Sequence, residues 1–98
     1  MDITCGLIKG RHKLPDYIKD YVFDSDIPQA HICDSAYLEE ICTAFLALRY
    51  DAKTVNVYVT GFTPAMLALV RICSLRGVKL NAYNYDRESK KFWKQEVI

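Results

Sequence analysis

The sequence predicts an α/β domain with a mostly parallel sheet and one antiparallel strand at its C-terminal edge. Short β-branched runs alternate with longer apolar runs at helical spacing through the middle of the chain. Strands joined through a helix are parallel neighbours, and the crossover is right-handed. Near the C-terminus, a polar turn at residues 86–90 separates two strand-like runs, which is typical of a hairpin. Ninety-eight residues fit a single domain, 1–98.

The first half of the chain is expected to hold one strand and one clear helix. Residues 2–8 (DITCGLI) read as a strand. Residues 14–24 place apolar side chains at helical spacing, so a helical turn is expected there, although YVF within them fits a short strand equally well. After a polar loop, a helix with a broad apolar stripe is expected from Asp34 or Ser35, either of which can cap it, to about residue 50.

The second half is expected to add a strand, a helix and a hairpin. Residues 54–60 (TVNVYVT) are β-branched and read as a strand. The following helix is expected over residues 64–76, with Thr63 as its N-cap, Pro64 in its first position and Gly77 ending it.

That helix carries few charges and is apolar nearly all round, so it is expected to lie between the sheet and another layer, or at a dimer interface. Strands over residues 78–85 and 91–97 complete a small Rossmann-like domain of two or three layers.

Composition narrows the classes of function. Thirteen basic and twelve acidic residues argue against a dedicated double-stranded DNA-binding domain. No apolar run approaches the roughly 20 residues of a membrane span, and no signal-peptide pattern is present, so a cytoplasmic protein is expected. The four cysteines form no C-x-x-C pair and are expected to be reduced and buried. His12 and His31 are not spaced to join them in a zinc site, and no metal or cofactor is predicted.

Three segments are expected to meet at the carboxyl ends of the parallel strands, where open sheets bind ligands. They are residues 9–13, 60–63 and 84–87. In the middle segment, Gly61 would let the backbone turn without a Cβ clash, and the N-terminus of the next helix would attract phosphate. The alternative is an ordinary strand-to-helix turn, because no lysine accompanies this loop as in a P-loop.

The first and last of these segments add charge and aromatic rings. Arg11 and Lys13 could complete an anion site, and His12 could serve as a general acid or base, although a solvated loop is the simpler interpretation. Aromatic residues around the C-terminal turn could stack on bases or pack across the hairpin. The candidate ligand-binding residues are Gly10, Arg11, Lys13, Thr60, Gly61, Phe62 and Thr63, and His12 is the candidate catalytic residue.

The stretch VTGFTPAM, residues 59–66, resembles a turn found in CRISPR-associated Rossmann-fold (CARF) sensors and related ring nucleases. In that family a hydrophobic strand often ends in a Thr-Gly-Gly-Thr-Lys-x-Met-like turn, which Thr60, Gly61, Thr63 and Met66 match. Pro64 stands in place of the lysine. The resemblance implies a cyclic oligoadenylate ligand at a dimer interface, contacted by this turn and by the loop that holds Gly10, Arg11 and His12.

The leading hypothesis is therefore a homodimeric domain that binds a nucleotide or a cyclic oligonucleotide. A second is a non-catalytic interaction module, such as a phage- or mobile-element-encoded modulator of a host complex, because the chain is compact, nearly neutral and without a catalytic motif. A third is a phosphodiesterase or ring nuclease, which rests on His12 and Arg11 alone.

Overall fold

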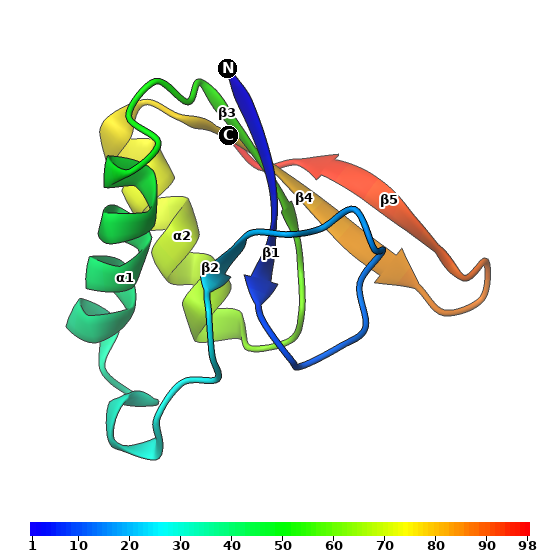
Figure 1. Cartoon of the computed structure of the whole chain (residues 1–98), viewed down its shortest axis with the longest axis horizontal. Coiled ribbons are helices and arrows are strands. Elements are labelled where there is room, and N and C mark those ends of the chain that lie inside the picture. Colours follow the sequence, from blue (N-terminus) through cyan, green and yellow to red (C-terminus); the bar gives the residue numbers. More distant parts are fainter.

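The computed structural model describes all of residues 1–98 and contains a five-stranded sheet in the order β2-β1-β3-β4-β5 (Figure 1). Neighbouring strands are parallel from β2 to β4, and β5 is antiparallel to β4. The predicted α/β class, with its antiparallel C-terminal edge strand, is confirmed. The elements are β1 (Asp2–Ile8), β2 (Tyr21–Phe23), the short 3-10 helix η1 (Gln29–His31), α1 (Ser35–Ala47), β3 (Thr54–Tyr58), α2 (Thr63–Arg76), β4 (Lys79–Asp86) and β5 (Lys91–Glu96).

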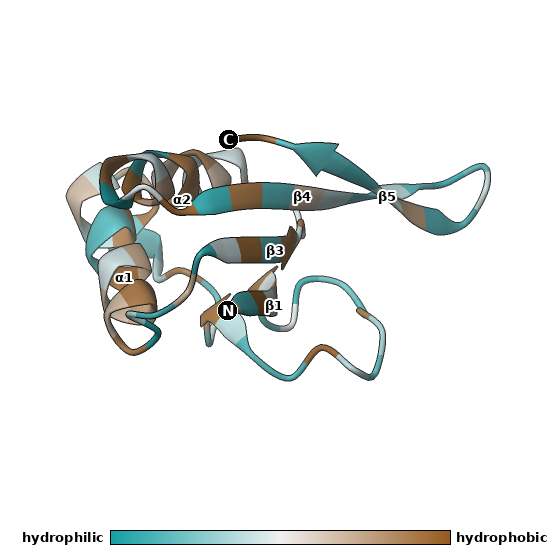
Figure 2. Ribbon diagram, turned by 90° about the horizontal axis from the view of Figure 1, so that it is seen from above, coloured by the Kyte–Doolittle hydropathy of each residue, from teal (hydrophilic) through white to brown (hydrophobic).

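The domain has two layers, because both helices lie on the same side of the sheet (Figures 1 and 2). The chain reaches β2 from β1 through a loop, residues 9–20, and not through a helix. It then passes through α1 to β3, which pairs with the other side of β1. The chain therefore leaves β1 towards both of its neighbours, and the sheet has a topological switch point between β1 and β3.

Alternating side chains of the central strands build the main core against the helices. Val55 and Val57 of β3 are fully buried, as the spacing of a half-covered strand requires. The helices contribute matching apolar stripes. This core includes Ile3, Cys5 and Leu7 of β1, Leu80 of β4, Leu38, Cys42, Phe45 and Leu46 of α1, and Ala65, Ala68, Leu69, Ile72 and Cys73 of α2.

The opposite face of the sheet carries a smaller cluster, in which Leu14 and Ile18 of the 9–20 loop pack with Tyr58. The loop approaches the sheet closely at Gly6, where an added Cβ would lie 2.5 Å from the ring of Tyr21 and 2.8 Å from Leu14. This position therefore needs a glycine for space rather than for its backbone angles. The 9–20 loop covers part of this face, and no helix lies on it.

The expected helical turn in residues 14–24 is wrong for its last part, because YVF forms strand β2. It pairs in parallel with β1, with Gly6 opposite Tyr21. The N–H of Gly6 donates to the carbonyl of Asp20 at 2.9 Å, and that of Lys9 donates to Phe23 at 3.0 Å. The backbone of β1 thus supplies the hydrogen-bond partners of β2, and the spacing of apolar residues within residues 14–24 does not reveal this pairing.

The start of α2 also differs from the prediction. Phe62 is the N-cap, and α2 begins at Thr63, so Thr63 is not the cap and its side chain caps nothing. The outer side of α2 faces solvent and not another layer, since Leu67 and Leu75 are exposed. Two terminal signals are confirmed: Gly77 ends α2 with a positive φ of 70°, and Asp34 caps α1 by accepting the Tyr37 N–H at 3.1 Å.

The cysteines do not all behave as expected. Cys5, Cys42 and Cys73 are buried and free, but Cys33 is exposed because it lies in the irregular segment just before α1. Neither helix has the length and apolar composition needed to cross a membrane.

Candidate functional site

A cleft of about 430 Å³ lies at the carboxyl edge of the parallel strands. Three loops meet there: the one after β1, the one after β3, and the turn that joins β4 to β5. Because the switch point between β1 and β3 lies at this edge, the cleft is where an open α/β sheet is expected to bind its ligand. It is lined by His12, Lys13, Leu14, Val59, Gly61, Asn84, Tyr85, Arg87 and Phe92.

Basic side chains form one part of the cleft wall. His12, Lys13 and Arg87 come from two loops that are more than 70 positions apart in the sequence, and no carboxylate lines the cleft with them. Lys13 and Arg87 form no ion pair with any acidic residue of the chain. The cleft therefore carries net positive charge that is not neutralised internally, which favours an anionic ligand.

Aromatic side chains form another part of the wall. Tyr85 and Phe92 are cross-strand partners on β4 and β5, with ring centroids 5.2 Å apart at 61°. Phe92 also packs edge-on against Tyr58 at 4.8 Å, and so is anchored in the smaller apolar cluster. Tyr85 remains 51% exposed. Cross-strand packing is therefore present, and it still leaves one aromatic ring open to the cleft.

Gly61 lines the cleft, but the reason for a glycine there differs from the prediction. Its φ is not positive, and an added Cβ would meet only Nε2 of His12, at 4.0 Å. Neither the turn nor the packing of the chain requires a glycine at this position. What the missing side chain does provide is open space on the cleft wall, beside His12.

Arg11 does not serve the cleft as an unpaired cation. Its Nε and Nη2 atoms donate to Oδ1 of Asp26 at 2.9 and 2.8 Å, and its Nη1 donates to the carbonyl of Gly61 at 3.2 Å. The guanidinium also lies 5.4 Å from the centre of the Phe62 ring. These hydrogen bonds hold the pKa of Asp26 below its ordinary value. Arg11 thus fastens three loops together, and Asp26 was not recognisable from the sequence, where it lies 15 positions away.

Thr60 is a structural residue rather than a wall of the cleft. It is 1% exposed, and its hydroxyl accepts the Ile8 N–H and donates to the Ile8 carbonyl, both at 3.1 Å. This hydroxyl bridges the end of β1 and the loop after β3.

The remaining predicted residues lie outside the cleft lining. Gly10 is exposed with a φ of 88° and has no neighbour within 4 Å of an added Cβ, so it serves the turn after β1. Phe62 caps α2 and lies against Arg11, and Thr63 is exposed at the first position of α2. The backbone N–H groups of residues 60–63 donate to no atom of the chain. Of the predicted site, the cleft thus brings together His12, Lys13 and Gly61.

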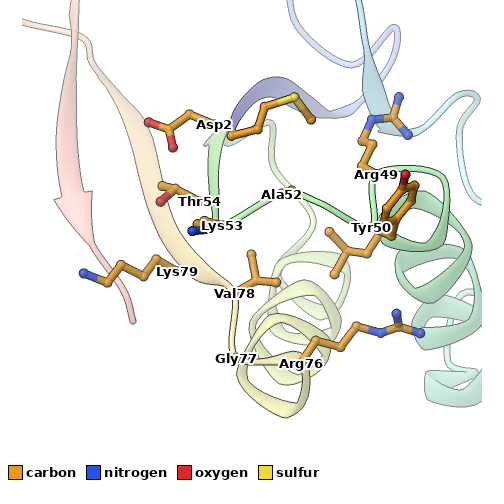
Figure 3. Close-up of a pocket in the computed structure, with 12 residues that line it drawn as sticks. Asp2, Arg49, Tyr50, Ala52, Lys53, Thr54, Arg76, Gly77, Val78 and Lys79 are labelled. Carbon is orange, nitrogen blue, oxygen red and sulfur yellow. The ribbon is translucent and has the colours of Figure 1, made fainter.

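The largest hollow of the molecule, about 840 Å³, lies at the opposite edge of the sheet (Figure 3). Basic residues line it too, but Figure 3 shows Arg76 and Lys79 extending in different directions. Arg49 is used internally, since it donates to the Phe45 carbonyl at 3.0 Å and covers the Phe45 ring. Because this hollow lies at the amino ends of the strands and its charges do not converge, the carboxyl-edge cleft is the better candidate site.

Comparisons with protein-family models, with curated proteins and with solved structures give no match for this chain. No group of three or more His, Cys, Asp and Glu side chains is placed to hold a metal ion. The cationic and aromatic side chains of the cleft are suited to an anion that carries an aromatic or otherwise flat group.

Proposed function

We propose that this domain binds a nucleotide, or an oligonucleotide such as a cyclic oligoadenylate, in the carboxyl-edge cleft. The observation that carries the proposal is the composition of the cleft wall, in which Lys13 and Arg87 are unpaired cations and Tyr85 is a half-exposed ring. Cations recognise phosphate, and an aromatic ring can stack on any of the bases. A nucleotide carries both of the groups that such a wall can bind, a phosphate and a base.

In this proposal, the two ends of the ligand contact different side chains of the cleft wall. The phosphate lies near Lys13 and Arg87, with the open space beside Gly61 allowing a close approach to the backbone. The base packs against Tyr85, which Phe92 supports from behind. Base–aromatic stacking is worth about 1–3 kcal/mol per base, so the loss of Tyr85 should weaken binding measurably.

Binding, and not phosphodiester cleavage, is the function that the side chains favour. His12 lies on the cleft wall and forms no ion pair with a carboxylate that would orient it, whereas His31, outside the cleft, is paired with Asp34. A general base in a hydrolytic site is ordinarily held by such a partner and placed beside a nucleophile. A role for His12 in contacting phosphate needs neither.

The test is a thermal-shift and calorimetric screen of the purified protein against mononucleotides, dinucleotides and cyclic oligonucleotides. At least one is expected to raise the melting temperature in a concentration-dependent way. The double variant Lys13→Ala/Arg87→Ala should lose this stabilisation. The matched control, Lys53→Ala/Arg76→Ala, removes the same charge from the hollow at the opposite edge and should keep it.

Gly61→Ala provides a second, sharper test. Its Cβ would stand in open space beside His12, so the domain should fold as well as wild type, while ligand affinity falls because the cleft wall has lost that space. If no nucleotide stabilises the protein, the proposal is rejected and the protein-interaction alternative becomes the stronger one. Equal loss of binding in both double variants would show that the cleft is not where the ligand sits.

A further inference from the structure

Strand β5 forms an open edge of the sheet. It pairs with β4 on one side, and no segment of the chain lies along its other side (Figures 1 and 2). The other edge strand, β2, has only three residues, whereas β5 has six. A long open edge presents a row of unpaired backbone groups that can accept another strand.

The register of the hairpin shows which backbone groups point outward. Val97 donates its N–H to Leu80 at 2.9 Å, and bonded pairs alternate along an antiparallel ladder. The backbone groups of Lys91, Trp93 and Gln95 therefore point towards β4. Those of Phe92, Lys94 and Glu96 point away from the sheet, and they can form a second ladder without disturbing the first.

Edge strands are often protected from such pairing by lysines, and β5 carries Lys91 and Lys94. In a two-fold antiparallel pair of β5 strands, however, the register decides what each lysine meets. Centring on Phe92 would pair only residues 91–93 of β5 and bring Lys90 of the turn near Lys94. Centring on Lys94 would oppose the two copies of Lys94. Like charges that face each other are destabilising, so both registers are disfavoured.

Centring the pair on Trp93 removes these conflicts. Phe92 then faces Lys94 of the second copy, a cation beside an aromatic ring, and Lys91 faces Gln95. Just beyond the strand, Lys90 ends the turn with a positive φ of 58° and lies near Glu96 of the second copy, whose charge is opposite. Centring on Gln95 also avoids like charges, but it pairs only residues 94–96 of β5, whereas the Trp93 register pairs residues 91–95.

Trp93 itself supplies the apolar contact at the centre. It is 51% exposed on the face of β5 opposite to Phe92, and no aromatic neighbour in the chain packs against it. At the two-fold axis the two tryptophans form a non-hydrogen-bonded cross-strand pair, where opposing side chains come closest. Cross-strand aromatic pairs of this kind stabilise a sheet beyond the area they bury.

We propose that the β5 edge is a self-association surface, through which two copies of this chain pair antiparallel about a two-fold axis at Trp93 and join their sheets into one. The surface is self-complementary in charge, in aromatic contact and in backbone hydrogen bonding. It is independent of the proposed ligand, since the contacts need no nucleotide.

Sedimentation velocity over a range of protein concentrations tests the surface. A monomer–dimer equilibrium is expected without ligand. Lys94→Pro removes an outward N–H that β4 does not use, and should weaken dimerisation about ten-fold or more because two inter-chain hydrogen bonds are lost per dimer. Lys94→Ala keeps that N–H and should weaken it much less. Far-UV circular dichroism verifies that both variants are folded.

Two further measurements keep the test decisive. Trp93 is the only tryptophan in the chain, so an exciton couplet in circular dichroism should appear with dimerisation and vanish in Lys94→Pro. If Lys94→Pro does not fold, Trp93→Lys serves instead, because it opposes two lysines at the axis. A wild-type protein that remains monomeric at its highest attainable concentration overturns the proposal. So does a dimer that survives Lys94→Pro or Trp93→Lys, since it must use another surface.

Discussion

Replacing Thr60 by valine should destabilise the domain without harming its ligand cleft. Valine has nearly the same shape as threonine, so no cavity forms. Both hydrogen bonds between the Thr60 hydroxyl and the Ile8 backbone are lost, and the site is buried, since Thr60 is 1% exposed and Ile8 is 0% exposed. The N–H and the carbonyl of Ile8 then lose a partner where water cannot replace it.

Each buried polar group left without its partner costs about 1–3 kcal/mol, so the two together should lower the free energy of unfolding by about 2–6 kcal/mol. In a domain of this size, each 1 kcal/mol lowers the melting temperature by about 4–8 °C. Thr60→Ser keeps the hydroxyl and removes one methyl group, which should cost only about 0.5–1.5 kcal/mol.

Urea denaturation of the wild type and of both variants measures these differences, with an unchanged dependence on urea showing that the same surface unfolds. If Thr60→Val is as stable as Thr60→Ser, the two hydrogen bonds of the Thr60 hydroxyl do not stabilise the fold. A second readout concerns the ligand: any nucleotide that binds the wild type should bind Thr60→Val equally well at temperatures where the variant is folded. Loss of binding with unchanged stability would show instead that Thr60 contacts the ligand.

Three other predictions follow from contacts in the fold. Gly6→Ala should lower the free energy of unfolding by about 1–3 kcal/mol, because the new Cβ would overlap Tyr21 and Leu14 and the loop must move; thermal melting beside Gly61→Ala, which meets no such contact, checks this. Burial, and then the hydrogen bond with Tyr17, raise the pKa of Tyr58 from 10.0 to about 12. Its raised pKa stabilises the fold below about pH 10, and this contribution should be lost as the pH rises from 10 towards 12, which denaturation of Tyr58→Phe across that range would show by a flatter profile. In the native protein at pH 8, a thiol reagent should modify Cys33 quickly and the other three cysteines slowly, because burial raises the pKa of their thiols. Reaction of all four cysteines at one rate would contradict this prediction. Cys33→Ser, which should lack the fast phase, is the control.

Much of the fold could be predicted because its signals are local. The β-branched run in residues 54–60 and the cap at Asp34 are read from neighbouring side chains, and the structure contains both the strand and the cap. Gly77 ends α2 in the left-handed conformation that its residue type suggests. The misassigned segment, YVF, is stabilised instead by pairing with β1, which no short window of sequence contains.

The candidate site was predicted less well, since side-chain partners far apart in the sequence decide its roles. Arg11 was expected to be free for an anion, but it is paired with Asp26. Thr60 was expected to contact the ligand, but its hydroxyl is bonded to the backbone of Ile8. Arg87, in contrast, lies unpaired on the cleft wall, although nothing in its residue type distinguishes it from Arg11. Residue type alone cannot tell a free cation from one that is already neutralised.

Local sequence patterns were enough to predict a parallel sheet with a C-terminal hairpin, and to predict that the loops of interest follow β1, β3 and β4. Periodicity and turn residues act within a few positions, so they specify elements and their order. The three-dimensional arrangement was needed to show that both helices cover one face and that β5 has an open edge. It was also needed to show that the cleft is lined by residues that include His12, Lys13, Gly61, Tyr85 and Arg87. These features depend on which residues far apart in the sequence come into contact, because hydrogen bonding, charge pairing and burial all require such contacts.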